Sequence, residues 1–131
     1  IIVVHAGVSC GQPLPVHCPP GLAAHMLEEV QPTGLVLTHM GGYKQWSLVE
    51  ENLIGKQVYL DCAGCFDRMP KEQLERIVNR HGSDKILFGT DFPRENTRDA
   101  IEWIESSSLT QSQKQNIYIK NAYRLLNLHA L

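Results

Sequence analysis

The sequence predicts an α/β fold of about four parallel βα units plus a terminal helix, forming part of a (β/α)8 barrel. Short apolar runs of strand length alternate with amphipathic stretches of helical length. The runs are continuously apolar, as expected of parallel strands that are buried on both faces. Each run also leads directly to a side chain capable of chemistry: His5, His39, Asp61 or Asp91. Their intervals fit successive βα units of about 30 residues.

The strands are expected at the apolar runs that precede these four side chains. They cover residues 1–4, 35–38, 58–60 and 86–90. All four are rich in Val, Ile, Leu and aromatic side chains, which favour extended backbone. Because the carboxyl ends of parallel strands share one edge, the polar residues that follow them should lie together.

The helices are expected where apolar residues recur at spacings of three and four. They cover residues 22–30, 46–55, 70–82, 96–104 and 110–126. Pro70 is expected as the first helical residue of the third, and Gly55 and Gly82 as helix ends. Asn96 is a predicted N-cap, and Thr110 with Gln113 forms a predicted capping box.

A doubly wound open sheet is the other architecture that fits this order of elements. Such a sheet has one crevice at its switch point, so it has less need of a polar residue after every strand. No glycine-rich phosphate-binding fingerprint follows the first run. Both observations favour the barrel, with residues 1–131 as one partial domain. Because the chain starts at Ile1 inside a strand-like run, we expect it to begin within a larger protein.

The composition favours a soluble, cytoplasmic protein. Net charge is −2 and the pI is about 6.3, which predicts no nucleic-acid partner. No apolar run is long enough to predict a membrane span or a signal-peptide core. The four cysteines are expected to be reduced thiols.

The imidazole and carboxylate groups expected at the strand ends are suitable ligands for a zinc-like cation. Such an ion lowers the pKa of bound water to roughly 7. A nearby carboxylate can then take the water's proton and deliver it to a leaving group. A neutral imidazole can polarise a substrate carbonyl or exchange a proton with it.

Five segments resemble strand-end and closing motifs of the amidohydrolase superfamily. Its amidohydrolase-related branch, which includes aromatic-acid decarboxylases and lactonases, is the most similar. The segments are His5-Ala6-Gly7, Thr38-His39-Met40-Gly41-Gly42, Val58-Tyr59-Leu60-Asp61, Ile86-Leu87-Phe88-Gly89-Thr90-Asp91-Phe92-Pro93 and Lys120-Asn121-Ala122-Tyr123-Arg124-Leu125-Leu126. The resemblance covers nearly the whole chain, and Phe-Gly-Thr-Asp-x-Pro is its most specific part.

The resemblance implies that the chain is the C-terminal half of the barrel. His5 then matches the fifth-strand metal ligand, and His39 the sixth-strand residue that binds metal or substrate or acts in catalysis. Asp91 matches the eighth-strand ligand and proton shuttle, while Asp61 supports the site. The family's first-strand His-x-His pair and fourth-strand residue have no counterpart here. The chain therefore offers two usual metal ligands, His5 and Asp91, with His39 as a possible third.

The function that this resemblance implies is metal-dependent hydrolysis of a C–N or C–O bond in a small carbonyl compound, with zinc as the expected cofactor. Non-oxidative decarboxylation is the alternative within the superfamily, and a nuclease is a weaker rival. A non-catalytic barrel fragment is the alternative outside enzymes. Arg94 either binds a substrate carboxylate or is a solvated loop charge. The two outer strands should be exposed sheet edges, so we expect an oligomer or docking to the remainder of the barrel.

Other features have weaker functional interpretations. Cys62 and Cys65 have redox-motif spacing, but a loop rather than a helix follows them. Cys10, His17 and Cys18 form only a scattered candidate zinc set. His25, His81 and His129 are expected in surface or capping roles, and Trp46 and Trp103 in packing.

Overall fold

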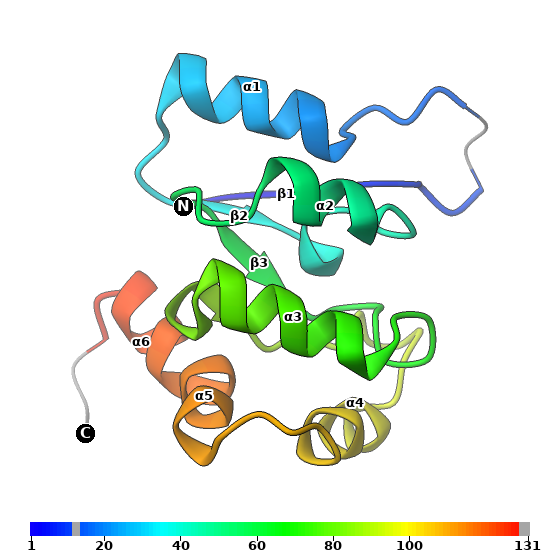
Figure 1. Cartoon of the computed structure of the whole chain (residues 1–131), viewed down its shortest axis with the longest axis vertical. Helices are drawn as coiled ribbons and strands as arrows, with labels where there is room; N and C mark the ends of the chain where they lie inside the picture. The colour runs from blue at the N-terminus through cyan, green and yellow to red at the C-terminus, as the bar shows by residue number, and fades with distance from the viewer. Residues whose placement is uncertain (12–13, 129–131) are drawn as a thin grey trace.

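Four parallel strands form the sheet of this structure. The computed structural model describes residues 1–11 and 14–128, so His129 lies outside the described residues. The strands are β1 (Ile2–Val4), β2 (Leu35–Leu37), β3 (Tyr59–Asp61) and β4 (Ile86–Leu87). They follow the order β1-β2-β3-β4, and every pairing is parallel. Figure 1 labels β1, β2 and β3, which lie one beside the next. This sequential order is that of a barrel segment rather than of a doubly wound sheet, so the barrel prediction is confirmed.

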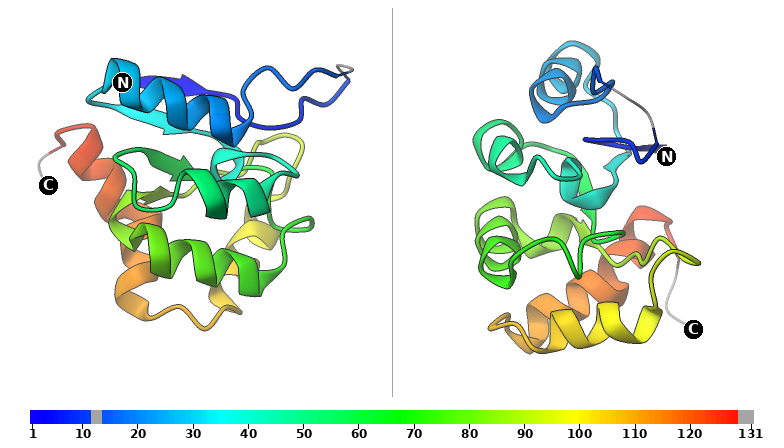
Figure 2. Two further views of the ribbon diagram at one scale, coloured as in Figure 1. Left: turned by 45° about the horizontal axis from the view of Figure 1, so that its top comes forward. Right: turned by 90° about the vertical axis from the view of Figure 1, so that its right-hand side faces the viewer.

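The described residues contain six α-helices, and α1 to α3 stack along one face of the sheet (Figure 2). Their bounds are α1 (Pro20–Val30), α2 (Trp46–Asn52), α3 (Lys71–His81), α4 (Thr97–Glu105), α5 (Gln111–Gln115) and α6 (Asn121–Leu125). Short 3-10 segments cover His39–Gly41 and Ser83–Lys85. A π-helical segment, Asn116–Lys120, joins α5 to α6, so the last predicted helix is continuous but locally widened.

The core lies between this helical layer and the sheet. In α3 the buried positions are Leu74, Ile77, Val78 and His81, the spacing of one helical face. His81 is therefore buried, and of the two predicted roles, surface or capping, the surface role is wrong for it. Trp46 and Trp103 are buried, as predicted, whereas His25 is exposed.

Several predicted element ends were wrong by a few residues, and the causes are local. Pro70 is the N-cap rather than the first residue of α3, and α2 ends at Asn52, before Gly55. The predicted strand 86–90 pairs only as far as Leu87. The N-cap at Asn96 and the Thr110–Gln113 capping box are confirmed by their hydrogen bonds.

The two outer strands of the sheet differ in their exposure. Along β1, Ile2 and Val3 are 57% and 62% exposed. The outer edge of β4 is instead occupied, because Phe88 N donates to Ile117 O (3.0 Å) and Asn121 Nδ2 donates to Ile86 O (2.7 Å). The C-terminal helical segment thus satisfies the edge that sequence analysis expected to be free. No helix within the described ranges is long and apolar enough to cross a membrane.

Candidate active site

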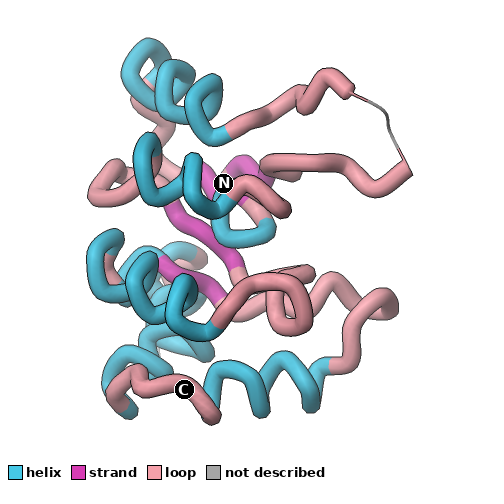
Figure 3. Tube along the Cα trace, turned by 45° about the vertical axis from the view of Figure 1, so that its right-hand side comes forward, coloured by secondary structure: helices cyan, strands magenta, loops and turns pink. Residues whose placement is uncertain are grey.

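The loops that follow the four strands gather along one side of the molecule (Figure 3). A cavity of about 360 Å³ opens among them. Its lining residues are His5, Ser9, Cys10, His39, Tyr43, Gly64, Arg68, Asp91, Arg94 and Glu95. The structure therefore brings the predicted residues His5, His39 and Asp91 into the wall of one cavity.

The imidazoles of His5 and His39 are in direct contact. His39 Nδ1 lies 2.6 Å from Ala63 O, and because a carbonyl only accepts, Nδ1 carries a proton. His39 Nε2 lies 3.0 Å from His5 Nδ1, and His5 Nε2 lies 3.3 Å from Val8 O. The pair thus spans two backbone carbonyls, which fixes both rings at the cavity wall.

The backbone of His39 is held in an uncommon conformation. His39 and Met40 have φ values of 58° and 52°, a region that non-glycine residues rarely adopt. Trp46 Nε1 donates to His39 O at 2.9 Å, which ties the turn to the start of α2. Backbone strain of this kind persists where surrounding contacts hold it, and such places cluster at functional sites.

Asp61, at the end of β3, supports this turn from behind. Its Oδ1 accepts from His39 N and from Ala63 N, both at 3.0 Å. Burial raises the pKa of the Asp61 carboxyl, although these two hydrogen bonds oppose the shift. Asp61 is not among the cavity-lining residues, so it holds the backbone on both sides of the His39 ring, as the resemblance implies.

Gly64 lets the β3 loop pass beside the His39 ring. Its φ is +69°, and a Cβ there would lie 2.8 Å from His39 Nδ1 and 3.7 Å from Asp91 Oδ2. The side chains of both candidate residues, His39 and Asp91, therefore approach the same point, which a methyl group would fill. Sequence analysis missed this residue, because a glycine in a loop carries no local sign of what it faces.

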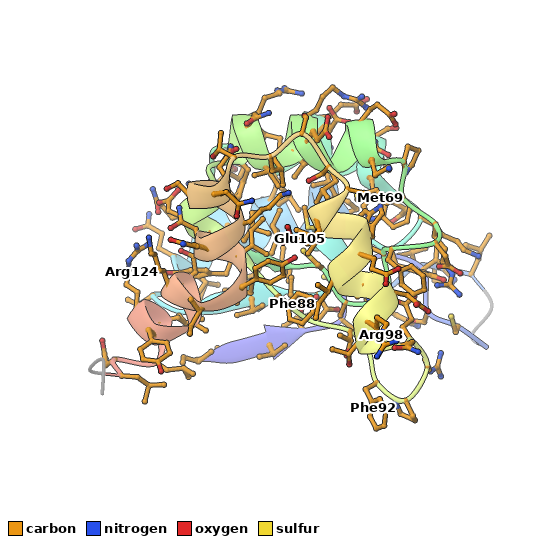
Figure 4. The ribbon with its side chains drawn as sticks, turned by 90° about the horizontal axis from the view of Figure 1, so that it is seen from below. Met69, Phe88, Phe92, Arg98, Glu105 and Arg124 are labelled. Carbon is orange, nitrogen blue, oxygen red and sulfur yellow. The ribbon has the colours of Figure 1, made fainter. Side chains whose placement is uncertain are left out.

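Asp91 lies in the loop between β4 and α4. Its φ is 63°, and its carbonyl accepts from Arg94 N at 2.9 Å, which closes a tight turn. Phe92 projects at the tip of this loop, away from the body of the molecule, and is 79% exposed (Figure 4). Asp91 lies in the cavity wall, whereas its neighbour Phe92, in the same turn, points outward.

A charged cluster that sequence analysis did not identify forms another part of the wall. Arg68 Nη1 donates to Glu95 Oε1 at 2.5 Å and to the Asp67 carboxylate. The Arg68 guanidinium carbon also lies 6.0 Å from the centre of the Tyr43 ring. Glu95 is buried, and burial raises the pKa of its carboxyl. Among the described residues, its Oε2 has no hydrogen-bond partner.

The donor set only partly fits the predicted metal ion. Across residues 1–11 and 14–128, no three His, Cys, Asp or Glu side chains stand close enough to hold an ion together. Both ring nitrogens of His5 are engaged in contacts, and one of these must open for coordination. This part of the chain therefore holds at most an incomplete set of candidate metal ligands, and Cys10, His17 and Cys18 form no second set.

The two cysteines with redox-motif spacing are buried thiols. Burial raises the pKa of Cys62 and of Cys65 well above that of a free thiol. Cys62 Sγ contacts the Met40 sulfur, and Cys65 Sγ donates to Ala63 O. Thiolate is the reactive form, so these residues pack under the His39 turn rather than carry redox chemistry.

Sequential parallel βα units, with imidazole and carboxylate groups meeting at the strands' carboxyl ends, define the chain as part of a (β/α)8-barrel domain. The chain belongs to the amidohydrolase family, because the family model described as "Amidohydrolase" matches residues 1–128.

Among curated proteins, a gamma-resorcylate decarboxylase of Polaromonas sp. (strain JS666 / ATCC BAA-500) is 25% identical over 139 residues. The match covers 91% of this chain and 42% of that relative. The chain thus spans about two fifths of the length of the curated relative that it matches.

Two solved structures share the fold. A dihydroxybenzoic acid decarboxylase from Polaromonas sp. JS666, with bound manganese and the inhibitor 2-nitroresorcinol, has a TM-score of 0.63 at 23% identity, covering 84% of this chain and 38% of that one. An amidohydrolase from Burkholderia multivorans with bound zinc has a TM-score of 0.61 at 17% identity, covering 81% and 50%. The predicted family and barrel fold are therefore confirmed, and these relatives hold a divalent metal ion.

Proposed function

We propose that this chain supplies half of the active site of a non-oxidative decarboxylase that acts on a hydroxylated aromatic acid. One observation carries the proposal. His5, His39 and Asp91 line a single cavity. The chain that carries them matches a gamma-resorcylate decarboxylase over 91% of the chain's length. That relationship favours the alternative from sequence analysis over hydrolysis, which becomes the rival.

Decarboxylation of an aromatic acid requires a proton donor beside the ring. The bond between the ring carbon and the carboxylate breaks, its electron pair remains on the ring carbon, and CO2 leaves. The ring carbon takes up one proton in exchange. In the proposed mechanism the Asp91 carboxyl group delivers this proton and regains one from solvent, to which Asp91 is exposed. When its contact with His5 Nδ1 opens, His39 Nε2 accepts a hydrogen bond from a ring hydroxyl and orients the ring, while Nδ1 stays bonded to Ala63 O.

The predicted metal ion remains part of the proposal. His5 and Asp91 would contribute two ligands, and the others would come from outside the described residues. A divalent cation supplies neutralisation of the substrate's anionic oxygens when bound. Zinc and manganese both suit imidazole and carboxylate donors.

The test is CO2 release from 2,6-dihydroxybenzoate by the purified protein, supplied with manganese or zinc. We expect resorcinol as the second product, and a loss of roughly 10²–10⁴-fold in kcat for Asp91→Asn and His39→Gln. Asp99→Asn, an exposed carboxylate on α4, is the matched control and should leave kcat unchanged. Hydrolysis of an amide or lactone by the same residues, without CO2 release from aromatic acids, would contradict the proposal.

A further inference from the structure

We propose that Arg68 binds the carboxylate group of the substrate through the Nε–Nη2 edge of its guanidinium. The inference rests on the proposed function, because it names the residue that recognises the acid group of that substrate. Arg68 lies in the loop between β3 and α3 and lines the same cavity as His39 and Asp91. Sequence analysis considered Arg94 for this role instead.

The guanidinium of Arg68 is held in place before any ligand arrives. Its Nη1 donates to two carboxylates, Asp67 and Glu95, and its carbon lies 6.0 Å from the centre of the Tyr43 ring. The Glu95 side chain is only 4% exposed, so its pairing with Arg68 is protected from water on one side. A planar guanidinium fixed in this way loses little freedom when it forms further hydrogen bonds.

These contacts leave one side of the guanidinium available. The group has five N–H donors in a fixed plane, and both carboxylates contact Nη1. Within the described part of the chain, no acceptor bonds to Nε or Nη2. These two nitrogens form a fork whose parallel N–H bonds match the two oxygens of a carboxylate. The Arg68 side chain is 38% exposed and lines the cavity, so a bound acid can reach it.

Arg94 lacks this preparation. It also lines the cavity, but the whole residue is exposed and its side chain forms no hydrogen bond with the described residues. Ordering a free arginine side chain costs conformational entropy at the moment of binding. Arg68 has already lost that freedom on folding, which is why it is the better carboxylate receptor of the two.

The chemistry of decarboxylation limits what Arg68 can do for the rate. The carboxylate loses its negative charge as CO2 leaves. A cation beside its oxygens therefore interacts more strongly with the starting acid than with the departing CO2. Arg68 therefore stabilises the bound substrate and does not accelerate the chemical step. Its loss should therefore raise KM without lowering kcat.

The experiment compares an acid with its carboxylate-free product. Binding of 2,6-dihydroxybenzoate and of resorcinol to the purified protein is measured by calorimetry for the wild type, Arg68→Gln, Arg68→Lys and Arg94→Gln, together with kcat and KM. We expect Arg68→Gln to weaken the binding of 2,6-dihydroxybenzoate by about 10- to 100-fold, because a bidentate charge-assisted pair is lost. Resorcinol binding should change by less than about threefold, and kcat should not fall. Arg68→Lys, which keeps the charge but not the fork, should show an intermediate loss for the acid.

The outcomes separate this inference from the proposed function. If Arg68→Gln weakens the binding of the acid and of resorcinol equally, Arg68 has a structural role and the inference is overturned. A larger effect of Arg94→Gln on the binding of the acid would overturn it too. A wild-type protein that releases CO2 while Arg68→Gln keeps its KM refutes the inference alone. Arg68-dependent binding of the acid without CO2 release refutes the proposed function alone. Unchanged circular dichroism and melting temperature of Arg68→Gln and Arg68→Lys would exclude unfolding as the cause.

Discussion

Two of the candidate catalytic residues, His39 and Asp91, sit on strained backbone. Their φ values are 58° and 63°, and such conformations cost roughly 1–3 kcal/mol each. At His39 the surrounding contacts offset this cost, since Asp61, Ala63 and Trp46 all form hydrogen bonds with it. Both residues belong to types that tolerate positive φ better than most, which fits their place directly after a strand. The strain directs each side chain into the cavity.

Gly64 provides the sharpest test at the scale of the residue. In Gly64→Ala the new methyl group would lie 2.8 Å from His39 Nδ1, so the ring must move and lose its bond to Ala63. We expect roughly a hundredfold loss of kcat/KM, the effect of a catalytic group displaced by about 1 Å. The measurement is steady-state kinetics with the proposed aromatic acid.

Gly55→Ala is the matched control for that variant. Gly55 has a similar φ of +80°, but a Cβ there would meet nothing within 4 Å. Both variants should lose roughly 1–2 kcal/mol of unfolding free energy from the left-handed conformation. Only Gly64→Ala should lose activity, and equal activity losses in both would contradict the steric argument.

At the scale of the elements, His81 connects the end of α3 to the loop before β3. Its Nε2 lies 2.9 Å from Val58 O, and its Nδ1 accepts from Gly55 N at 3.2 Å. The ring is therefore a neutral tautomer that donates on one side and accepts on the other. Burial lowers the pKa of His81 below its ordinary value of 6.5.

This lowered pKa predicts a loss of stability in mild acid. As the pH falls below 6.5, the unfolded chain binds a proton at His81 before the folded chain does. The free energy of unfolding should therefore fall as the pH drops from 7 to 5.5, by up to about 1.4 kcal/mol per pH unit. Urea unfolding across this range should show a shallower fall for His81→Gln. His25→Gln, at an exposed site, should retain the wild-type slope; identical slopes in all three proteins would refute the prediction.

For the whole molecule, the two outer strands of the sheet differ in whether their outer edge is covered. In β4 the outward backbone groups bond to Ile117 and Asn121, so this edge offers no free pairing groups there. In β1, by contrast, Ile2 and Val3 remain largely exposed. Exposed apolar edge strands invite pairing with another chain. Association is therefore expected through β1.

We predict that residues 1–131, prepared alone, associate in a concentration-dependent manner. Val3→Lys should reduce this association, because a charged side chain on an edge strand opposes pairing. Sedimentation velocity over a dilution series is the measurement. Leu14→Lys, at an 81% exposed position outside the sheet, should change nothing. A wild-type chain that stays monomeric at high concentration would show that the β1 edge is not an association surface.

Much of this protein was predictable from local sequence pattern. Continuous apolar runs and helical spacing determined the type and order of the elements, because burial periodicity and capping act between residues close in the chain. The convergence of His5, His39 and Asp91 on one cavity also followed, since parallel strands in sequential order end at the same edge. The early end of β4 did not follow, because it depends on a bond from Phe88 to distant Ile117.

Only the tertiary structure decided how the cavity wall is built. The pairing of Arg68 with Glu95, the space that Gly64 leaves beside His39, and the burial of Cys62 each depend on residues more than 20 positions apart. A side chain's charge and size are local properties, whereas its partner is set by the curvature of the sheet and by the loops above it. The sequence therefore determined which chemical groups reach the site, and the packing of its loops determined which of them touch.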